Sequence, residues 1–315
     1  MNTKSRIGVA CIALTTLLCG RIRAEAPQPT TTVSDSSRFL RFVPDAQGGK
    51  LQASVVTYRN ADGVTVDLIA AIHIADKGFF ADLNKSFEQY DALLYEMVKP
   101  KDMEFAGAGA TSRPAGAARP AGSHAPRNLS WVGTMQRFMR DNLDLTFQLD
   151  EIDYSRPNFV HADLDVETFT QMQDERGESM LSLMFQTMLR ELANESSKKA
   201  DAADVQPSAF DLLAALQSTD RSRQLKLILA KQFTQMDDMM AGFDGPDGNG
   251  SVLVTERNKA AINVLRQRIL KGDKKLGIFY GAAHLKGMEK ILLGDLGFQQ
   301  VGEPKWRTAW DLAAK

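Results

Sequence analysis

Three residues that could carry chemistry each follow a predicted core strand. In open α/β sheets, ligands bind in the crevice outside the carboxyl ends of the strands. Two imidazoles and one carboxylate form the ligand set of many divalent-metal sites, which leave a position open for water. The chain therefore offers a candidate metal site at one edge of a sheet. The three residues are His73 (after a strand at 64–72), Glu96 (after 92–95) and His284 (after 276–280).

Each of the three residues also has a structural explanation. A lone histidine after a strand is more often hydrogen-bonded within the fold than bound to a metal, and a glutamate there often caps the next turn. Other ligands are scarce, because the chain has two cysteines, Cys11 and Cys19, and four histidines. A disulfide scaffold and a cysteine-ligated zinc site are therefore excluded after residue 19.

Further features could extend such a site. His161 and Asp163 could supply another ligand or a general base, or they form a loop before a helix capped near Asp165. His124 lies among Ala, Gly and Pro, and we expect it to be solvated. Residues 245–250 imitate a calcium loop, but glycine holds the first ligand position, so we interpret them as a turn.

Hydrophobic patterns predict sheet and helix at both ends of the chain. Residues 51–58 and 64–72 are strand-like around a turn at 60–63, which predicts a hairpin. Helical spacing over 79–90, followed by a strand at 92–95, predicts a strand–helix–strand unit with parallel strands. The C-terminal part predicts a helix over 255–271, a strand at 276–280, a turn at 281–284, a helix at 288–293 and closing strands at 298–301 and 306–310.

The middle of the chain has a different character. Residues 129–242 show helical spacing, which predicts an all-helical insertion. Seven of the 13 methionines lie between residues 172 and 240, where they could line an adaptable peptide groove or pack in a core. Residues 106–126 are mostly Ala, Gly and Pro, so we expect a surface spacer or a lid that is dispensable for folding. The predicted fold is α/β, a split mixed sheet formed by N- and C-terminal segments with a large helical insertion.

The first residues are typical of an export signal. Lys4 and Arg6 precede an uncharged, mostly apolar stretch over 7–20, and cleavage could follow Ala24 or Ala26. We therefore expect a secreted or periplasmic protein with no stable membrane insertion after cleavage; an uncleaved anchor is the alternative. The net charge of −1 and the absence of a long Lys/Arg run argue against nucleic acid as a partner.

These patterns divide the chain into six predicted segments. They are a signal peptide (1–26), a disordered leader (27–38), an N-terminal α/β half (39–100), a low-complexity insertion (101–128), a helical insertion (129–250) and a C-terminal α/β half (251–315).

Two groups of motifs together resemble the TraB/TIKI family, also called TraB/GumN or PrgY-like. The first group is Ile72–Lys77, Phe79–Phe80 and Tyr90–Glu96, a histidine motif followed by a helix and a strand that ends in Glu. The second group is Glu256–Asn258, Tyr280–Gly287 and Asp295–Phe298, an Arg-Asn element, a second histidine motif and a closing loop. The match covers about residues 50–100 and 250–302, and the helical middle fits only by character.

The resemblance implies a split α/β fold with an inserted helical region. Characterised animal members are metal-dependent proteases that trim an extracellular signalling protein, and bacterial members include proteins that silence peptide pheromones. By this resemblance His73, Glu96 and His284 would hold a divalent ion (Mn, Co or Zn), and Arg257 and Asn258 would support this site. The catalytic residues would then be Glu96, Arg257 and Asn258.

One position departs from the family pattern. The first motif reads Ala70-Ala-Ile-His73, whereas the family has glycine where Ala70 stands; glycine permits a close backbone approach or a positive φ. The working hypothesis is an exported metal-dependent hydrolase, a peptidase acting on a peptide or protein substrate. The alternative is a non-enzymatic peptide-binding or sequestering protein of the same fold.

Overall fold

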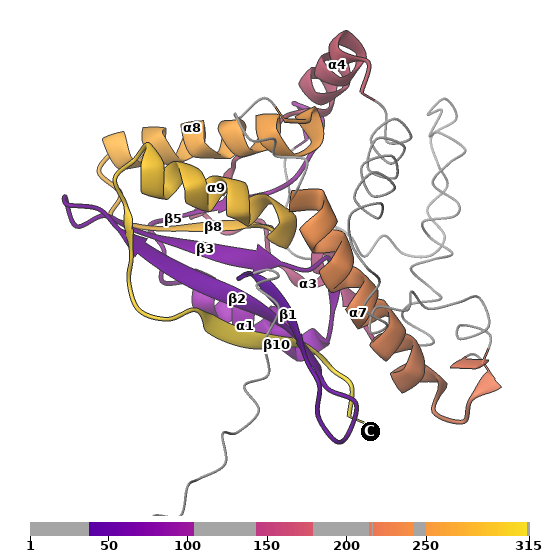
Figure 1. Cartoon of the computed structure of the whole chain (residues 1–315). Helices are drawn as coiled ribbons and strands as arrows, with labels where there is room; N and C mark the ends of the chain where they lie inside the picture. Colours follow the sequence, from indigo (N-terminus) through magenta and orange to yellow (C-terminus); the bar gives the residue numbers. More distant parts are fainter. Residues whose placement is uncertain (1–37, 104–142, 179–213, 216, 242–249, 314–315) are drawn as a thin grey trace, which may run out of the picture. The chain divides into compact units, whose positions relative to one another are not determined.

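Both ends of the sequence build one eight-stranded mixed sheet in the computed structural model of the chain (Figure 1). This confirms the predicted α/β class. The strands of the main path run in the order β1-β2-β3-β8-β5-β7, and β9 and β10 pair with β2. The structure describes residues 38–103, 143–178, 214–215, 217–241 and 250–313.

The predicted N-terminal hairpin is confirmed. β2 (Lys50–Arg59) is antiparallel to β3 (Thr65–Ala71), and β1 (Leu40–Val43) pairs with the first half of β2. The backbone N–H of Asn60 donates to the carbonyl of Val64, and Gly63 supplies the positive φ of the turn. The side chains of β3 become fully buried towards its end, as its apolar sequence predicts.

The strand–helix–strand unit forms, but its two strands are not neighbours. α1 (Lys77–Phe87) connects β3 to β5 (Ala92–Tyr95), and β8 (Lys275–Gly281) lies between these strands, parallel to both. Since β8 comes from the other end of the chain, the central strand of the sheet is supplied by the C-terminal half.

The remaining C-terminal elements cover and close the sheet. The predicted closing strands are confirmed as β9 (Gln299–Gln300) and β10 (Lys305–Asp311), both antiparallel to β2. The helix predicted from residue 255 begins instead as a π-helical turn, η2 (Val252–Glu256), which continues as α8 (Arg257–Leu270).

The last helix also starts earlier than its sequence pattern indicates. α9 (Ala282–Gly294) begins directly after β8, so His284 lies in its first turn and not in a loop. The predicted turn at 281–284 is therefore wrong, and the imidazole is held on a helix.

The prediction of an all-helical middle is wrong in two places. β7 (Phe159–His161) joins the main sheet beside β5, and β6 (Thr146–Phe147) pairs with β4 (Ile74–Ala75). The helices that the structure describes in this region include α3 (Gln148–Glu151), α4 (Val166–Arg176) and α7 (Arg221–Ala241). The signal segment 1–26, leader residues 27–37 and most of the insertion 101–128 lie outside the described residues.

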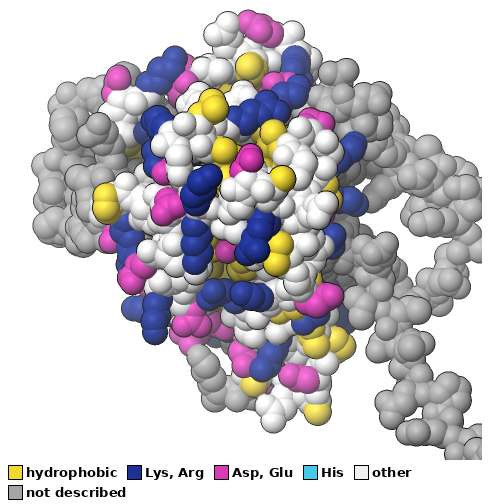
Figure 2. Space-filling model, turned by 90° about the vertical axis from the view of Figure 1, so that its left-hand side faces the viewer, with side chains coloured by type: hydrophobic (Ala, Val, Ile, Leu, Met, Phe, Trp, Pro, Cys, Tyr) yellow, Lys and Arg dark blue, Asp and Glu magenta, His cyan; other side chains and the backbone are white. Residues whose placement is uncertain are grey.

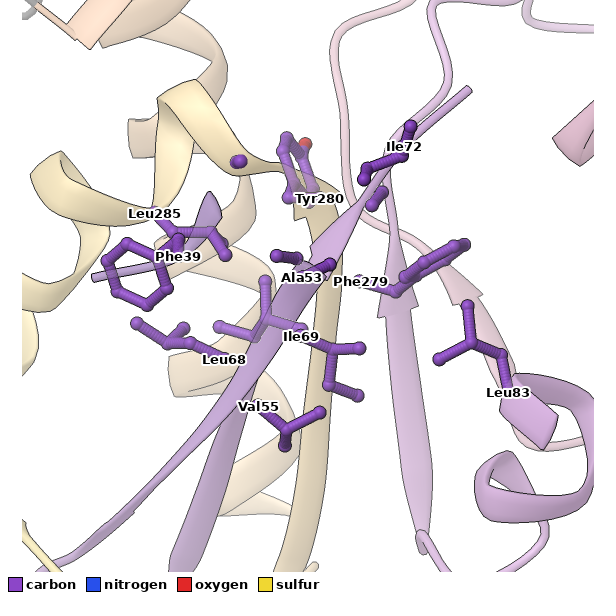
Figure 3. Close-up of a cluster of buried hydrophobic side chains, with 14 of the residues drawn as sticks. Phe39, Ala53, Val55, Leu68, Ile69, Ile72, Leu83, Phe279, Tyr280 and Leu285 are labelled. Atoms are coloured by element: carbon purple, nitrogen blue, oxygen red, sulfur yellow. The ribbon is translucent and has the colours of Figure 1, made fainter. Parts of the chain in front are cut away.

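Two apolar layers bury the sheet. Figure 3 shows Leu285 of α9 beside Phe39 and Leu68 on one side, and Leu83 of α1 beside Phe279 on the other. All five side chains are buried. Among the helices that the structure describes, none is long and apolar enough to cross a membrane.

Candidate functional site

The predicted site residues converge at the carboxyl edge of the central strands. His73 follows β3, Glu96 follows β5, and His284 lies just after β8. Because these strands are parallel and adjacent, their carboxyl ends meet. The three side chains, together with Arg257, line one cavity of about 230 Å³.

Arg257 is the centre of a buried ionic cluster. Its Nη2 donates to Glu96 Oε1 (2.6 Å) and to Asp163 Oδ2 (2.7 Å), and its Nε donates to Asp163 Oδ1 (2.9 Å). The Asp163 side chain is 0% exposed and those of Arg257 and Glu96 are close to a tenth exposed. A guanidinium satisfies two carboxylates with directed bonds, which compensates for the loss of their hydration.

Glu96 is held as a carboxylate. Its second oxygen, Oε2, accepts the backbone N–H of Gly281 at 2.6 Å. A Cβ at position 281 would lie 3.2 Å from that oxygen, so glycine allows this close approach. Burial by itself would raise the pKa of the Glu96 carboxyl, but His284, Arg257, His73 and the Gly281 N–H outweigh it and lower the pKa to about 2.

Asn258 fixes the ring of His284. The amide nitrogen of Asn258 donates to the carbonyl of His284 (3.2 Å), so its Oδ1 is the acceptor that faces Nδ1 of the imidazole at 2.8 Å. We therefore assign the proton to Nδ1 and the lone pair to Nε2, which faces Nη1 of Arg257 at 3.4 Å. Burial, the largest effect, lowers the pKa of His284 despite the nearby Glu96, so the imidazole is neutral at neutral pH.

The donor atoms fit a divalent cation in part. His284 Nε2 lies 3.7 Å from Glu96 Oε1, within the roughly 3–4 Å expected between two ligands of one cation. A neutral imidazole beside an ionised carboxylate is suitable chemistry for such an ion. His73 is exposed and lines the same cavity, but among the described residues no group of three potential ligands is arranged to hold a metal. Two of the three expected ligands are thus near each other, and Arg257 faces both of their donor atoms.

The other candidates take separate places. His161 bonds through Nε2 to the carbonyl of Met97 at 2.7 Å, and Asp165 caps α4 by accepting from the N–H of Thr168. His124 and residues 245–249 of the calcium-like loop lie outside the described residues. For Asp163 the sequence allowed two roles, a general base or part of a loop before a helix. Its pairing with Arg257 means that both of its oxygens are already engaged.

Ala70 requires no glycine-like backbone. It lies inside β3, opposite Tyr280 of β8, and is 1% exposed. Among the described non-glycine residues, only Asp144 has a positive φ. The alanine in the first histidine motif is therefore compatible with an ordinary extended strand.

Comparison of the chain with models of known families, with curated proteins and with solved structures finds no match. The resemblance to the TraB/TIKI family therefore depends on the motifs alone, and membership stays a prediction.

Proposed function

We propose that the chain is an exported, metal-dependent hydrolase of peptide bonds, of the TraB/TIKI type. The observation that carries this proposal is the convergence of His73, Glu96 and His284 around one cavity. These residues come from three separate parts of the sequence, and their types suit a divalent ion. Export depends on the signal-like segment 1–26, which gives the expectation of a secreted or periplasmic location.

The roles follow from the geometry of the cluster. Glu96 and His284 would hold the ion (Mn, Co or Zn) through Oε1 and Nε2, and His73 would complete the set from the exposed side of the cavity. When bound, the ion supplies a Lewis acid that polarises a carbonyl and lowers the pKa of water. Arg257 keeps Glu96 ionised and oriented, and Asn258 keeps the lone pair of His284 directed at the cavity.

One face of the molecule carries mixed charges, which argues against a polyanion as its partner. Figure 2 shows basic and acidic side chains mixed over the face that it presents, with no continuous basic area. This agrees with a net charge of −1.

Metal content tests the proposal directly. The purified chain is loaded with Mn, Co or Zn, dialysed, and analysed by mass spectrometry of the elements. We expect about one equivalent of one metal in the wild type, and at least a tenfold loss in His284→Ala and Glu96→Gln. His161→Ala is the matched control, because this histidine bonds to Met97 outside the cavity. Absence of metal from the loaded wild type would contradict the proposal.

The non-enzymatic peptide-binding protein is the second candidate, and one observation favours it. Glu96 Oε1 and His284 Nε2, the two atoms that would hold the ion, already face Nη2 and Nη1 of Arg257 at 2.6 and 3.4 Å, so both have partners without a cation. A binder of this kind would hold peptides without hydrolysing them and would keep its stability in a chelator. A hydrolase would lose turnover in the chelator and regain it when the metal is returned.

A further inference from the structure

The cavity beside the ionic cluster has mostly apolar walls. Beyond His73 and the cluster residues Glu96, Arg257 and His284, the described lining consists of aliphatic and aromatic side chains, alanines and one glycine. The larger ones come from four elements, and they are Leu40 of β1, Leu51 of β2, Phe233 of α7 and Leu253 of η2, with Ile72 at the end of β3. Its volume of about 230 Å³ is below the roughly 300–1,000 Å³ of pockets that enclose drug-sized ligands.

The carboxylates beside the cavity already accept hydrogen bonds. Glu96 and Arg257 bond to each other at 2.6 Å, and Arg257 also bonds to Asp163. With His284 neutral, two carboxylates against one guanidinium leave one excess negative charge, which would repel a glutamate side chain. A lysine side chain would lose its hydration and would meet only carboxylate oxygens that already accept N–H groups of Arg257 or Gly281. An aliphatic or aromatic side chain would instead transfer apolar surface from water to an apolar wall.

Phe233, which lines the cavity, is held in place by packing. The ring of Phe233 meets that of Trp310 edge-on, with 5.4 Å between their centres. The indole N–H of Trp310 donates to the carbonyl of Ile74, one residue after His73. Helix α7 of the inserted region is thereby connected to the segment that carries the first histidine.

We propose that this cavity receives one uncharged, apolar side chain of a peptide, with Phe233 and Leu253 as the walls that determine its size. The inference rests on the proposed function in taking the ligand to be a peptide, and it adds the class of residue beside the reacting bond. Phe233 and Leu253 are specificity-determining residues and take no part in the chemistry.

Peptide binding tests the pocket without requiring hydrolysis. The probes are Ac-Ala-X-Ala-NH₂ with X as Leu, Phe, Lys or Glu, titrated into metal-free, methyl-labelled protein and followed by NMR. We expect the Leu or Phe peptide to bind at least tenfold more tightly than the Lys and Glu peptides. The NMR signals of the methyl groups of Ile72, Leu40, Leu51 and Leu253 should shift when the peptide binds. Equal or tighter binding of a charged peptide, or binding that leaves these methyls unchanged, would overturn the inference, and so would the absence of binding by all four peptides.

Two variants locate the effect in the wall. Phe233→Leu should change the ratio of Phe-peptide to Leu-peptide affinity at least threefold. Leu227→Ala, on the same helix but outside the cavity lining, should leave that ratio unchanged. If Phe233→Leu does not fold, Leu253→Ala is the replacement, with the same expectation. If the ratio of Phe-peptide to Leu-peptide affinity does not change in the Phe233 or Leu253 variant, that residue does not determine the size of the pocket. A chain that binds the apolar peptide but holds no metal would reject the hydrolase and leave the pocket assignment standing.

Discussion

At the scale of single residues, the site depends on one guanidinium that donates hydrogen bonds to two buried carboxylates. Arg257 bonds to Asp163 through two nitrogens and to Glu96 through one of them. Asp163 therefore determines where the guanidinium lies, and the guanidinium in turn orients Glu96. We regard Asp163 as a positioning residue for the cluster.

Removing the charge of Asp163 should be costly. In Asp163→Asn the guanidinium loses its bidentate partner in a buried site, and breaking such a pair costs up to about 3–5 kcal/mol of unfolding free energy. Urea denaturation measures the loss. Glu88→Gln is the control, because Glu88 pairs with Arg156 at the surface with its side chain 64% exposed, where such pairs contribute about 0–1 kcal/mol. Equal costs in the two variants would contradict the role of Asp163.

The tautomer of His284 should depend on Asn258. In Asn258→Ala the Nδ1–H loses its acceptor, so we expect a mixture of the two neutral tautomers. Leaving a buried donor unsatisfied should also lower the unfolding free energy by about 1–3 kcal/mol. Long-range ¹H–¹⁵N spectra of the imidazole report the tautomer. Asn258→Asp retains an acceptor oxygen and should keep the Nδ1–H form; a wild-type spectrum in the alanine variant would show that Asn258 does not set it.

The sequence allowed a residue to be placed in the site when that residue directly follows a predicted strand. His73, Glu96 and His284 could be assigned to one edge because strand ends can be located from apolar runs. The pairing of Asp163 with Arg257 could not be predicted, since the partners are 94 positions apart and come from separate elements. Only the general rule that a buried arginine needs carboxylates could have indicated such a partner.

At the scale of elements, β8 is the strand on which the site depends, and Gly277 allows it to pack. A Cβ at this position would lie 2.6 Å from Leu93 Cδ1 and 3.2 Å from atoms of Ile69 and Tyr90. These neighbours are buried, so they have little room to move. Gly277→Ala should therefore lower the unfolding free energy by about 1–3 kcal/mol, the usual cost of overpacking.

Gly294→Ala is the matched control for that change. It lies at the last position of α9, and nothing stands within 4 Å of the added Cβ. Alanine there should raise stability by about 0.4–1 kcal/mol, chiefly by restricting the unfolded chain. Thermal unfolding of both variants gives the comparison; two changes of the same sign would contradict the packing argument.

Asp91 aligns the starts of β5 and β8 and should make their pairing sensitive to acid. Its Oδ2 accepts the backbone N–H groups of Lys275 and Lys274 at 2.8 and 2.9 Å, and these bonds lower the pKa of Asp91 from its ordinary value of 3.8. A lowered pKa in the folded state gives stability that is present above 3.8 and is lost as the pH falls through the folded value.

Asp91 therefore stabilises the fold when it is ionised, and this contribution decreases in acid. Asp91→Asn should be less stable than the wild type at pH 7, and the difference should shrink steadily as the pH is lowered below 3.8. Urea denaturation at several pH values measures it. Asp62→Asn, in the exposed turn after β2, controls for the loss of one negative charge. A difference that stays constant with pH would contradict the effect.

Helices and strands could be predicted where the hydrophobic pattern was long. They were harder to predict where a short segment is a strand only because it pairs with a neighbouring strand. The hairpin and α1 have enough residues for a clear period. β7 has three residues, Phe159–His161, and is a strand because the edge of β5 offers hydrogen bonds. The start of α9 was missed because Gly281-Ala-Ala-His284 has no large apolar residues at helical spacing and follows a strand directly.

At the scale of the whole molecule, the two ends of the chain cannot form the sheet separately. β3 and β5 come from the N-terminal part and flank β8 from the C-terminal part, while β10 pairs with β2. The sheet therefore depends on pairings between residues far apart in sequence, and such pairings slow folding. The split sheet was predictable, because the motifs at both ends must share one edge; the position of β8 between β3 and β5 was not, since apolar runs do not reveal strand order.

The final prediction concerns the continuity of the chain between β5 and β6. Cutting at a protease site placed within residues 106–126 should not separate the two fragments, because β8 of the C-terminal fragment remains paired with β3 and β5 of the N-terminal fragment. The fragments should elute together on size exclusion in buffer and apart in urea. Their urea midpoint should fall below that of the uncut chain, since unfolding then also releases one fragment from the other. The uncut chain carrying the same site is the control, and fragments that separate in buffer would show that the pairing of β8 with β3 and β5 cannot hold the halves without a covalent link.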